Sequence, residues 1–222
     1  MEPLPSNYAH LDAAANQLAH ILREAGISHV FLGGYAAGLL GSRRITKDIN
    51  IVTERPAGHV LNGVPEFSWS REEKCWKYGD GDIEVNITTS MPDSSPGKFP
   101  SPRAAGRHTV SPRDLPKRSI YAKIDILHPS VLVLTKLKAW YAAEVSQEPS
   151  LQLRTRAHFV DIMASLQWLS DEHERINLEG YPWVPKQELL HLLCRLYQMH
   201  HQARPYLAAT LSLKDMRDVL CS

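Results

Sequence analysis

Residues 31–52 read FLGGYAAGLLGSRRITKDINIV, and this segment constrains the chain more than any other. The pattern predicts an apolar strand, a Gly33-Gly34 turn, a short helix of small residues and a second strand with Asp48 and Asn50 near its start. Side chains alternate along a strand, so Asp48 and Asn50 share one face. We therefore expect oxygen ligands on one face of a sheet, beside a turn whose free backbone amides suit a phosphate.

This segment resembles the signature of the nucleotidyltransferase superfamily, the polymerase-beta-like fold that also includes antibiotic nucleotidyltransferases and AbiEii-type toxins. In that family a Gly-Gly or Gly-Ser turn precedes an Asp-x-Asp strand, and three carboxylates on neighbouring strands hold two magnesium ions. The resemblance implies transfer of a nucleotidyl group from a nucleoside triphosphate to a small molecule, tRNA or protein. The chain departs from the family pattern at Asn50, where the family has a carboxylate.

The third family acid sits on a later strand, and its best match is the segment DIEVNI at residues 82–87. Strict alternation puts Asp82, Glu84 and Asn86 on one face. The register leaves two alternatives open, because either Glu84 retains the third carboxylate or Asn86 replaces it. Each acid-to-amide change removes a charge that a two-ion site needs. We therefore expect one Mg²⁺ at Asp48 and Glu84, or none, rather than the pair.

A second resemblance covers residues 128–140, HPSVLVLTKLKAW, which look like the helix that follows the catalytic sheet in related minimal nucleotidyltransferases. The resemblance implies that Lys136 faces the nucleotide phosphates, whereas the helix alone allows a lysine that snorkels to solvent. Arg154, His158 and Asp161 follow at helical spacing and share a face. They are either further family residues or a surface ladder of salt bridges.

Together these motifs give a set of candidate site residues. The catalytic candidates are Asp48, Asn50, Glu84 and Asn86, with Asp48 and Glu84 as metal ligands, and the substrate-binding candidates are Gly33, Gly34, Tyr35, Arg44, Lys136, Arg154 and His158. The alternative function is a repurposed or inactive nucleotidyltransferase that binds a nucleotide or another small molecule in the same cleft. A carboxylate without its metal in an apolar cleft has a raised proton affinity, which suits metal-independent proton transfer. Whether the chain is an enzyme stays open.

The pattern of elements predicts an α+β fold, with a mixed β-sheet flanked by helices and then a C-terminal helical bundle. We expect a nucleotidyltransferase-like core at residues 1–127 and a helical domain at residues 128–222. Residues 90–117 are rich in proline and predict a long surface loop. The expected helices are 8–25, 35–40, 131–143 with Ser130 as N-cap, 151–169 and 187–201, and the expected strands are 28–32, 49–52, 67–69, 75–78, 82–87 and 120–127.

Composition excludes several classes of protein. The 222 residues carry 25 basic and 24 acidic side chains, so no global field attracts nucleic acid. No segment approaches the roughly 20 apolar residues of a membrane span. Three widely spaced cysteines argue against disulfides and cysteine zinc sites, and we expect a cytoplasmic protein. The basic residues of the proline-rich region either clamp an acidic ligand or are solvated, and we favour solvation; they are Arg103, Arg107, Arg113, Lys117 and Arg118.

Overall fold

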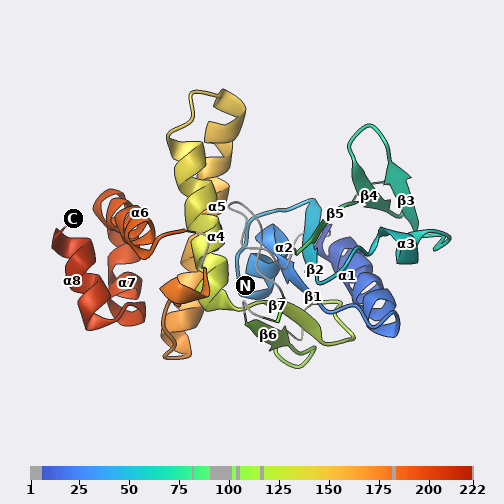
Figure 1. Ribbon diagram of the computed structural model, residues 1–222, viewed down its shortest axis with the longest axis horizontal. Coiled ribbons are helices and arrows are strands. Elements are labelled where there is room, and N and C mark those ends of the chain that lie inside the picture. Colours follow the sequence, from blue (N-terminus) through green and yellow to red (C-terminus); the bar gives the residue numbers. More distant parts are fainter. Residues whose placement is uncertain are drawn as a thin grey trace. The chain divides into compact units, whose positions relative to one another are not determined.

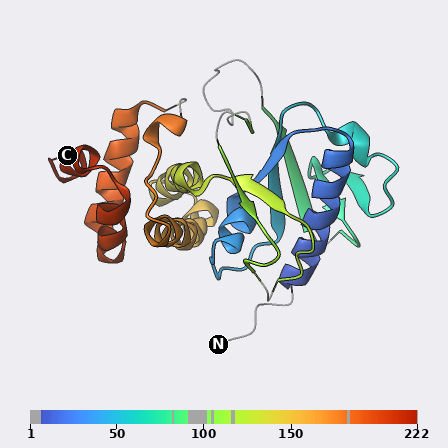
Figure 2. The same ribbon diagram turned by 90° about the horizontal axis from the view of Figure 1, so that it is seen from below.

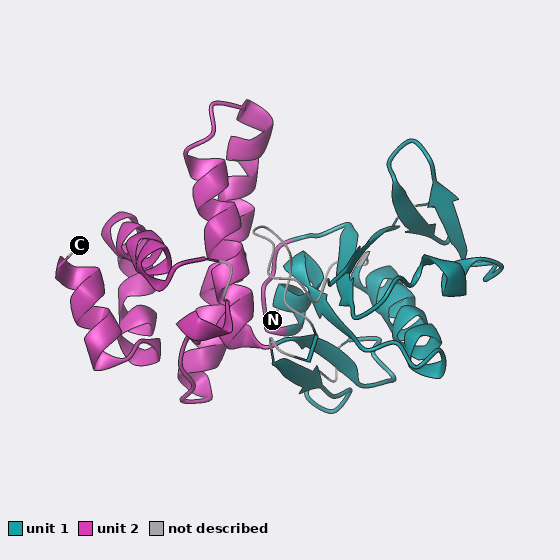
Figure 3. Ribbon diagram, viewed as in Figure 1, with its two compact units in different colours: residues 1–39, 45–127 teal, residues 40–44, 128–222 magenta. Residues whose placement is uncertain are grey.

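The computed structural model describes residues 7–81, 83–90, 102–103, 106–115, 118–181 and 184–221. The chain divides into two compact units (Figure 3). Unit 1 comprises residues 1–39 and 45–127, and unit 2 comprises residues 40–44 and 128–222. In the described part of the chain, no helix combines the length and the apolar character that crossing a bilayer requires.

Unit 1 is built on one seven-stranded sheet with the order β3-β4-β5-β2-β1-β7-β6 (Figure 1). β2 pairs in parallel with β5, and β1 pairs in parallel with β7, whereas the other pairs are antiparallel. The predicted mixed sheet is therefore confirmed. The strands are β1 (His29–Leu32), β2 (Asp48–Thr53), β3 (Phe67–Ser70), β4 (Cys75–Tyr78), β5 (Ile83–Thr89), β6 (Arg107–Val110) and β7 (Ile124–Leu127).

Three helices accompany the sheet in unit 1, namely α1 (Asn7–Glu24), α2 (Gly33–Leu39) and α3 (Gly58–Leu61). α1 packs against β2, β5 and β7 (Figure 2). Its side chains Leu11, Leu18 and Leu22 are buried at helical spacing. The helix ends at Glu24, and Gly26, two residues later, has a φ of +63°, the left-handed conformation that follows many helices.

The regular elements described in unit 2 are all helices. α4 and α5 form a helical hairpin, and the shorter helices follow in sequence. Trp140, Ile162 and Leu193 belong to its buried apolar core. The helices are α4 (Pro129–Glu144), α5 (Pro149–Asp171), α6 (Lys186–Met199), α7 (Arg204–Thr210) and α8 (Leu213–Cys221), with 3₁₀ turns η1 (Leu178–Gly180) and η2 (His201–Ala203). The predicted α+β class, ending in helices, is confirmed.

The start of α4 differs from the prediction. Ser130 is not the N-cap, because the helix begins at Pro129, two residues before the predicted start at residue 131. His128 is the N-cap, and its Nδ1 accepts the backbone N–H of Ser130 at 3.3 Å. Proline suits the first helical position, since it lacks an N–H that would have no intrahelical partner there.

The proline-rich region also differs from the prediction. Arg107–Val110 forms β6, so the prediction of a continuous loop is wrong there. The strand predicted at 120–127 is shorter, because only Ile124–Leu127 pairs, with β6 on one side and β1 on the other. Residues 91–101, 104–105 and 116–117, as well as Asp82, lie outside the described residues.

Candidate functional site

The two glycines of the predicted turn form the start of α2, and Gly33 lies against the side chain of Asn50. β1 and β2 are antiparallel, and Leu32 at the end of β1 is paired with Asn50. Gly33 has a φ of +76°, and a Cβ atom there would lie 2.9 Å from Asn50 Nδ2. Both the backbone conformation and the lack of space require glycine at this position. The chain thus brings the turn and the β2 strand together, as the motif predicted.

Asp48 is half-buried at the start of β2 and is held by two neighbours in the sequence. Thr46 Oγ1 donates to Asp48 Oδ1 at 2.6 Å, and the Asn50 amide donates to Asp48 Oδ2. An aspartate at position 50 would be ionised at neutral pH and could not donate this hydrogen bond. Asn50 therefore orients the Asp48 carboxylate with a neutral donor, where the family pattern has a second negative charge.

Glu84 and Asn86 lie on the neighbouring parallel strand. In the register between β2 and β5, Asp48 is opposite Glu84 and Asn50 is opposite Asn86. Opposite residues of paired strands point to the same face, so all four side chains share one face of the sheet. Glu84 Oε1 lies 3.4 Å from Lys77 Nζ on β4. We name Gly33, Thr46, Asp48, Asn50, Glu84 and Asn86 the Asp48 site.

The Asp48 site offers too few charged ligands for two metal ions. Its carboxylates are those of Asp48 and Glu84, on adjacent strands. Throughout the described ranges, no group of three histidine, cysteine, aspartate or glutamate side chains is arranged to hold a metal. Proteins commonly hold Mg²⁺ with one or two carboxylates together with water and substrate phosphates. The donor set fits one such ion and does not fit a pair.

Unit 2 contains a second polar cluster, centred on Asp161 of α5. Asp161 is fully buried, and its carboxylate accepts from Arg44 Nε at 2.8 and 2.9 Å. Lys136 Nζ on α4 lies 2.7 Å from Asp161 Oδ2. Ser42 Oγ donates to Asp161 Oδ1 at 2.8 Å. We name these four residues the Asp161 cluster.

The sequence left open whether Asp161 belongs to a surface ladder of salt bridges and whether Lys136 extends to solvent. The burial of the Asp161 cluster answers both questions. A surface ladder of salt bridges is wrong for Asp161, which has no exposed area. A snorkelling lysine is wrong for Lys136, because only 7% of its side chain is exposed and its ammonium pairs with Asp161. The contact of Lys136 with nucleotide phosphates stays a prediction.

The two remaining candidates on α5 have different surroundings. His158 lies one turn before Asp161 and is half-buried, and its Nδ1 has no hydrogen-bond partner among the described residues. Burial, and next the positive charge of Lys136, lower the pKa of His158 to about 4. His158 is therefore neutral at pH 7, whereas Arg154 is exposed on the same helix.

Tyr35 lies in the core of unit 1. It has no exposed area, and its hydroxyl donates to Asp12 Oδ1 at 3.0 Å. Burial, and next the Asp12 carboxylate, raise the pKa of Tyr35 well above its usual value. Asp12 also pairs with Arg118 at 2.5 Å, and only 4% of the Arg118 side chain is exposed. This burial does not support a substrate contact for Tyr35, and the prediction that Arg118 is solvated is wrong.

We expect Gly33→Ala to lower the free energy of unfolding by about 1–3 kcal/mol, because alanine is strained at this φ and its Cβ would displace the Asn50 amide. Gly63→Ala is the matched control, since Gly63 has a φ of +85° and a Cβ atom there would have nothing within 4 Å. Urea denaturation measures both variants. An equal decrease in the free energy of unfolding in Gly33→Ala and Gly63→Ala would show that crowding against Asn50 does not destabilise the protein.

Comparison with solved structures identifies one protein of similar fold and a weaker match. The crystal structure of an antigenic nucleotidyltransferase-like protein from Paracoccidioides brasiliensis matches with a TM-score of 0.67 and 19% identity, covering 95% of this chain and 97% of that chain. The solution structure of the antibiotic-resistance factor ANT(2'')-Ia matches with a TM-score of 0.42 and 14% identity, covering 87% of this chain and 98% of that chain.

Comparisons at the level of sequence gave no match, either with protein-family models or with curated proteins. At 19% identity, the likeness to the Paracoccidioides protein concerns the fold, and it extends over nearly the whole length of both chains. The mixed sheet and the helices that follow it agree with this likeness. The chain has the fold of that nucleotidyltransferase-like protein.

Proposed function

We propose that the chain binds a nucleoside triphosphate at the Asp48 site and transfers its nucleotidyl group to a hydroxyl or amine acceptor. In this reaction the acceptor atom attacks the α-phosphorus, the bond from that phosphorus to the bridging oxygen breaks, and pyrophosphate leaves. The acceptor's proton passes to a carboxylate of the site. The observation that carries the proposal is the contact of the Gly33 turn with Asn50, whose amide in turn holds Asp48.

One magnesium ion suits this proposal, with Asp48 and Glu84 as its protein ligands. Such an ion supplies positive charge against the charge that develops on the phosphates. Each carboxylate oxygen of Asp48 accepts one hydrogen bond, Oδ1 from Thr46 and Oδ2 from Asn50. A carboxylate has about four acceptor positions, so these two bonds do not exhaust it.

A second candidate function is a scaffold of the same fold that binds a small molecule without nucleotidyl transfer. The Asn50 amide favours it, because this amide neutralises part of the Asp48 charge without a metal. The pairing of Glu84 with Lys77 favours it too, since Lys77 is a permanent cation beside the other candidate ligand. The hydrogen bond with Glu73 raises the pKa of Lys77 further.

We expect Asn50→Asp to strengthen Mg²⁺ binding at least tenfold, because it adds a carboxylate beside Asp48 and removes a competing donor. Isothermal titration calorimetry with MgCl₂ measures the change. Asn62→Asp is the control, since Asn62 is exposed in the same unit and lies outside the Asp48 site. Equal Mg²⁺ affinity in wild type and Asn50→Asp would count against metal binding at Asp48.

Release of pyrophosphate distinguishes the two functions. The wild-type protein is incubated with each of the four nucleoside triphosphates and with an excess of hydroxyl- and amine-bearing acceptor molecules, in MgCl₂ or in EDTA. Release that requires Mg²⁺ and is lost in Asp48→Asn supports nucleotidyl transfer. Nucleotide binding of equal strength in MgCl₂ and EDTA, without pyrophosphate release, supports the scaffold and contradicts transfer.

A further inference from the structure

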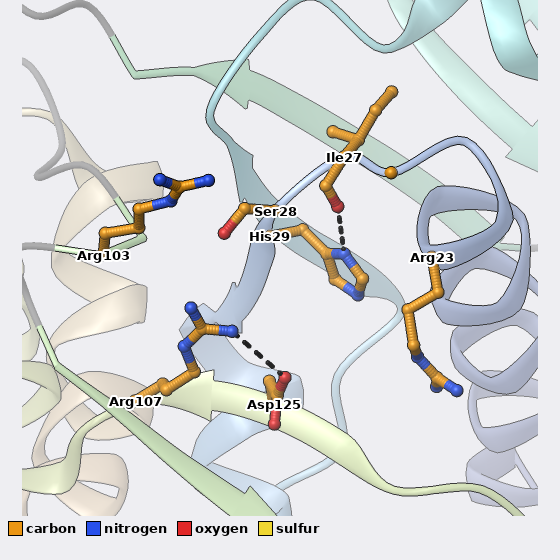
Figure 4. A pocket seen from close by; sticks show the side chains of 8 residues that line it. Arg23, Ile27, Ser28, His29, Arg103, Arg107 and Asp125 are labelled. Atoms are coloured by element: carbon orange, nitrogen blue, oxygen red, sulfur yellow. Dashed lines mark hydrogen bonds and ion pairs between the residues drawn. The ribbon is translucent and has the colours of Figure 1, made fainter.

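A pocket of about 380 Å³ opens in unit 1 at the first residues of β1 (Figure 4). Its walls come from segments that are far apart in the sequence. They are the end of α1, the connection from α1 to β1, the segment at position 103, and the strands β6 and β7. The polar side chains that line it are Arg23, Ser28, His29, Arg103, Arg107 and Asp125, which we name the Arg107 pocket.

The Arg107 pocket is separate from the Asp48 site. The pocket includes His29, the first residue of β1, which is paired with Thr53 of β2. The glycine turn follows Leu32, the last residue of β1, which is paired with Asn50. Three steps along a strand span roughly 10 Å, so the two sites lie at opposite ends of β1. The pocket therefore shares no residue with the Asp48 site, where the nucleotide is proposed to bind.

Positive charge dominates the lining of the pocket. Its charged side chains are three arginines and one carboxylate, that of Asp125. Asp125 Oδ2 lies 3.6 Å from Arg107 Nη1, and its Oδ1 accepts from Thr109 Oγ1 at 2.6 Å. Asp125 can therefore offset one guanidinium, and the lining itself carries three positive charges and one negative charge, a net charge of +2.

The other two arginines are anchored at the rim. Arg23 Nη2 donates to the backbone carbonyl of Lys123 at 3.0 Å, an acceptor without formal charge. Arg103 Nε lies 3.2 Å from Glu54 Oε1, and 70% of the Arg103 side chain is exposed. Arginine has five N–H donors in a planar fork, so a guanidinium that already contacts a protein oxygen can still bind an oxyanion.

Two buried polar groups lie between these arginines. Figure 4 shows Arg103 and Arg107 on one side of Ser28 and His29, and Arg23 on the other. The Ser28 hydroxyl is buried and finds no hydrogen-bond partner within the described part of the chain. His29 is 5% exposed, and its Nδ1 donates to the Ile27 carbonyl at 2.9 Å. Since buried hydroxyls are normally hydrogen-bonded, Ser28 supplies a donor for a ligand oxygen.

We propose that the Arg107 pocket binds the phosphate group of a small phosphorylated molecule. A phosphate monoester carries close to two negative charges at neutral pH, which suits a lining of three arginines and one carboxylate, even with Glu54 beside Arg103. Guanidinium groups bind phosphate through two parallel hydrogen bonds, and the Ser28 hydroxyl adds a donor from the pocket floor. A carboxylate has two oxygens where a phosphate monoester has three, so it can engage fewer of the three arginines.

The test is isothermal titration calorimetry of the full chain with inorganic phosphate, at low ionic strength and pH 7.5. We expect Arg107→Gln to weaken phosphate binding at least tenfold. We expect Asp125→Asn to strengthen it severalfold, because this change removes the only carboxylate of the described lining. Arg113→Gln is the control, since Arg113 is an exposed arginine of the same region outside the pocket. Circular dichroism confirms that each variant is folded.

Three outcomes would overturn the proposal. The first is an absence of phosphate binding at millimolar concentration. The second is equal weakening by Arg107→Gln and Arg113→Gln, which would mean a diffuse effect of net charge. The third is acetate binding as tightly as phosphate, which would assign the pocket to carboxylates. Weaker phosphate binding in Arg107→Gln together with stronger binding in Asp125→Asn would support a phosphate site. Unfolding cannot explain this pair of results, because it would weaken binding in both variants.

Discussion

Replacement of Asp161 by asparagine is expected to lower the free energy of unfolding of unit 2 by about 3–5 kcal/mol. The substitution keeps the size of the side chain and removes its charge. Arg44 and Lys136 then lose the carboxylate that both contact, and Lys136 is left as a buried ammonium with 7% exposure. Breaking a buried ion pair by removing one partner is costly because the other charge stays buried without compensation.

The Asp161 cluster joins three separate segments of unit 2. Ser42 and Arg44 precede β2, Lys136 lies on α4, and Asp161 lies on α5. The substitution therefore loosens the attachment of residues 40–44 as well as the packing of α4 on α5. Lys136→Met should cost less than Asp161→Asn, because it removes one cation and leaves Asp161 paired with Arg44.

Urea denaturation followed by far-ultraviolet circular dichroism measures this effect, since unit 2 contributes most of the helical signal. Asp171→Asn is the matched control, because it changes an exposed aspartate at the end of the same helix. We expect a loss within about 0.5 kcal/mol for the control. A loss in Asp161→Asn no larger than that in Asp171→Asn would contradict the role of the cluster.

Local patterns were sufficient to predict the centre of the fold. The apolar run ending at Leu32, the glycine turn and the alternation of β2 all depend on neighbours within a few positions. Periodicity also placed Asp48 and Asn50 on one face. Thr46 lies two residues before β2, outside the strand, so alternation did not predict its hydrogen bond with Asp48.

Contacts between distant segments could not be predicted in this way. Ser42 and Asp161 are 119 positions apart, and no local pattern marks Ser42 as a partner of a buried carboxylate. β6 is a short strand of mostly polar residues, and its pairing with β7 prevails over its weak propensity. Tyr35 was misinterpreted because α2 is buried on nearly all sides, so its apolar spacing did not reveal which residues face a cleft.

The second large effect concerns Asp48 itself. We expect Asp48→Ala to weaken nucleotide binding about 100-fold in the presence of Mg²⁺, because it removes the carboxylate beside the Gly33 turn. Asn50 then loses the acceptor of its amide hydrogen bond, and Glu84 is the one carboxylate that remains in the Asp48 site. In EDTA the difference between wild type and Asp48→Ala should shrink to a few-fold.

Asp80→Ala is the control for this change, because Asp80 is an exposed aspartate of the same unit in the turn after β4. We expect it to bind nucleotide as the wild type does, with and without Mg²⁺. Comparable losses in Asp48→Ala and Asp80→Ala would indicate a general effect of negative charge.

The most direct measurement is therefore a calorimetric titration of wild type and Asp48→Ala with nucleoside triphosphates, in MgCl₂ and in EDTA. The central claim is that the Gly33 turn and Asp48 bind one ligand together. It predicts nucleotide affinity that rises with Mg²⁺ in the wild type and is lost in Asp48→Ala. Affinity that is indifferent both to Mg²⁺ and to the loss of Asp48 would contradict it.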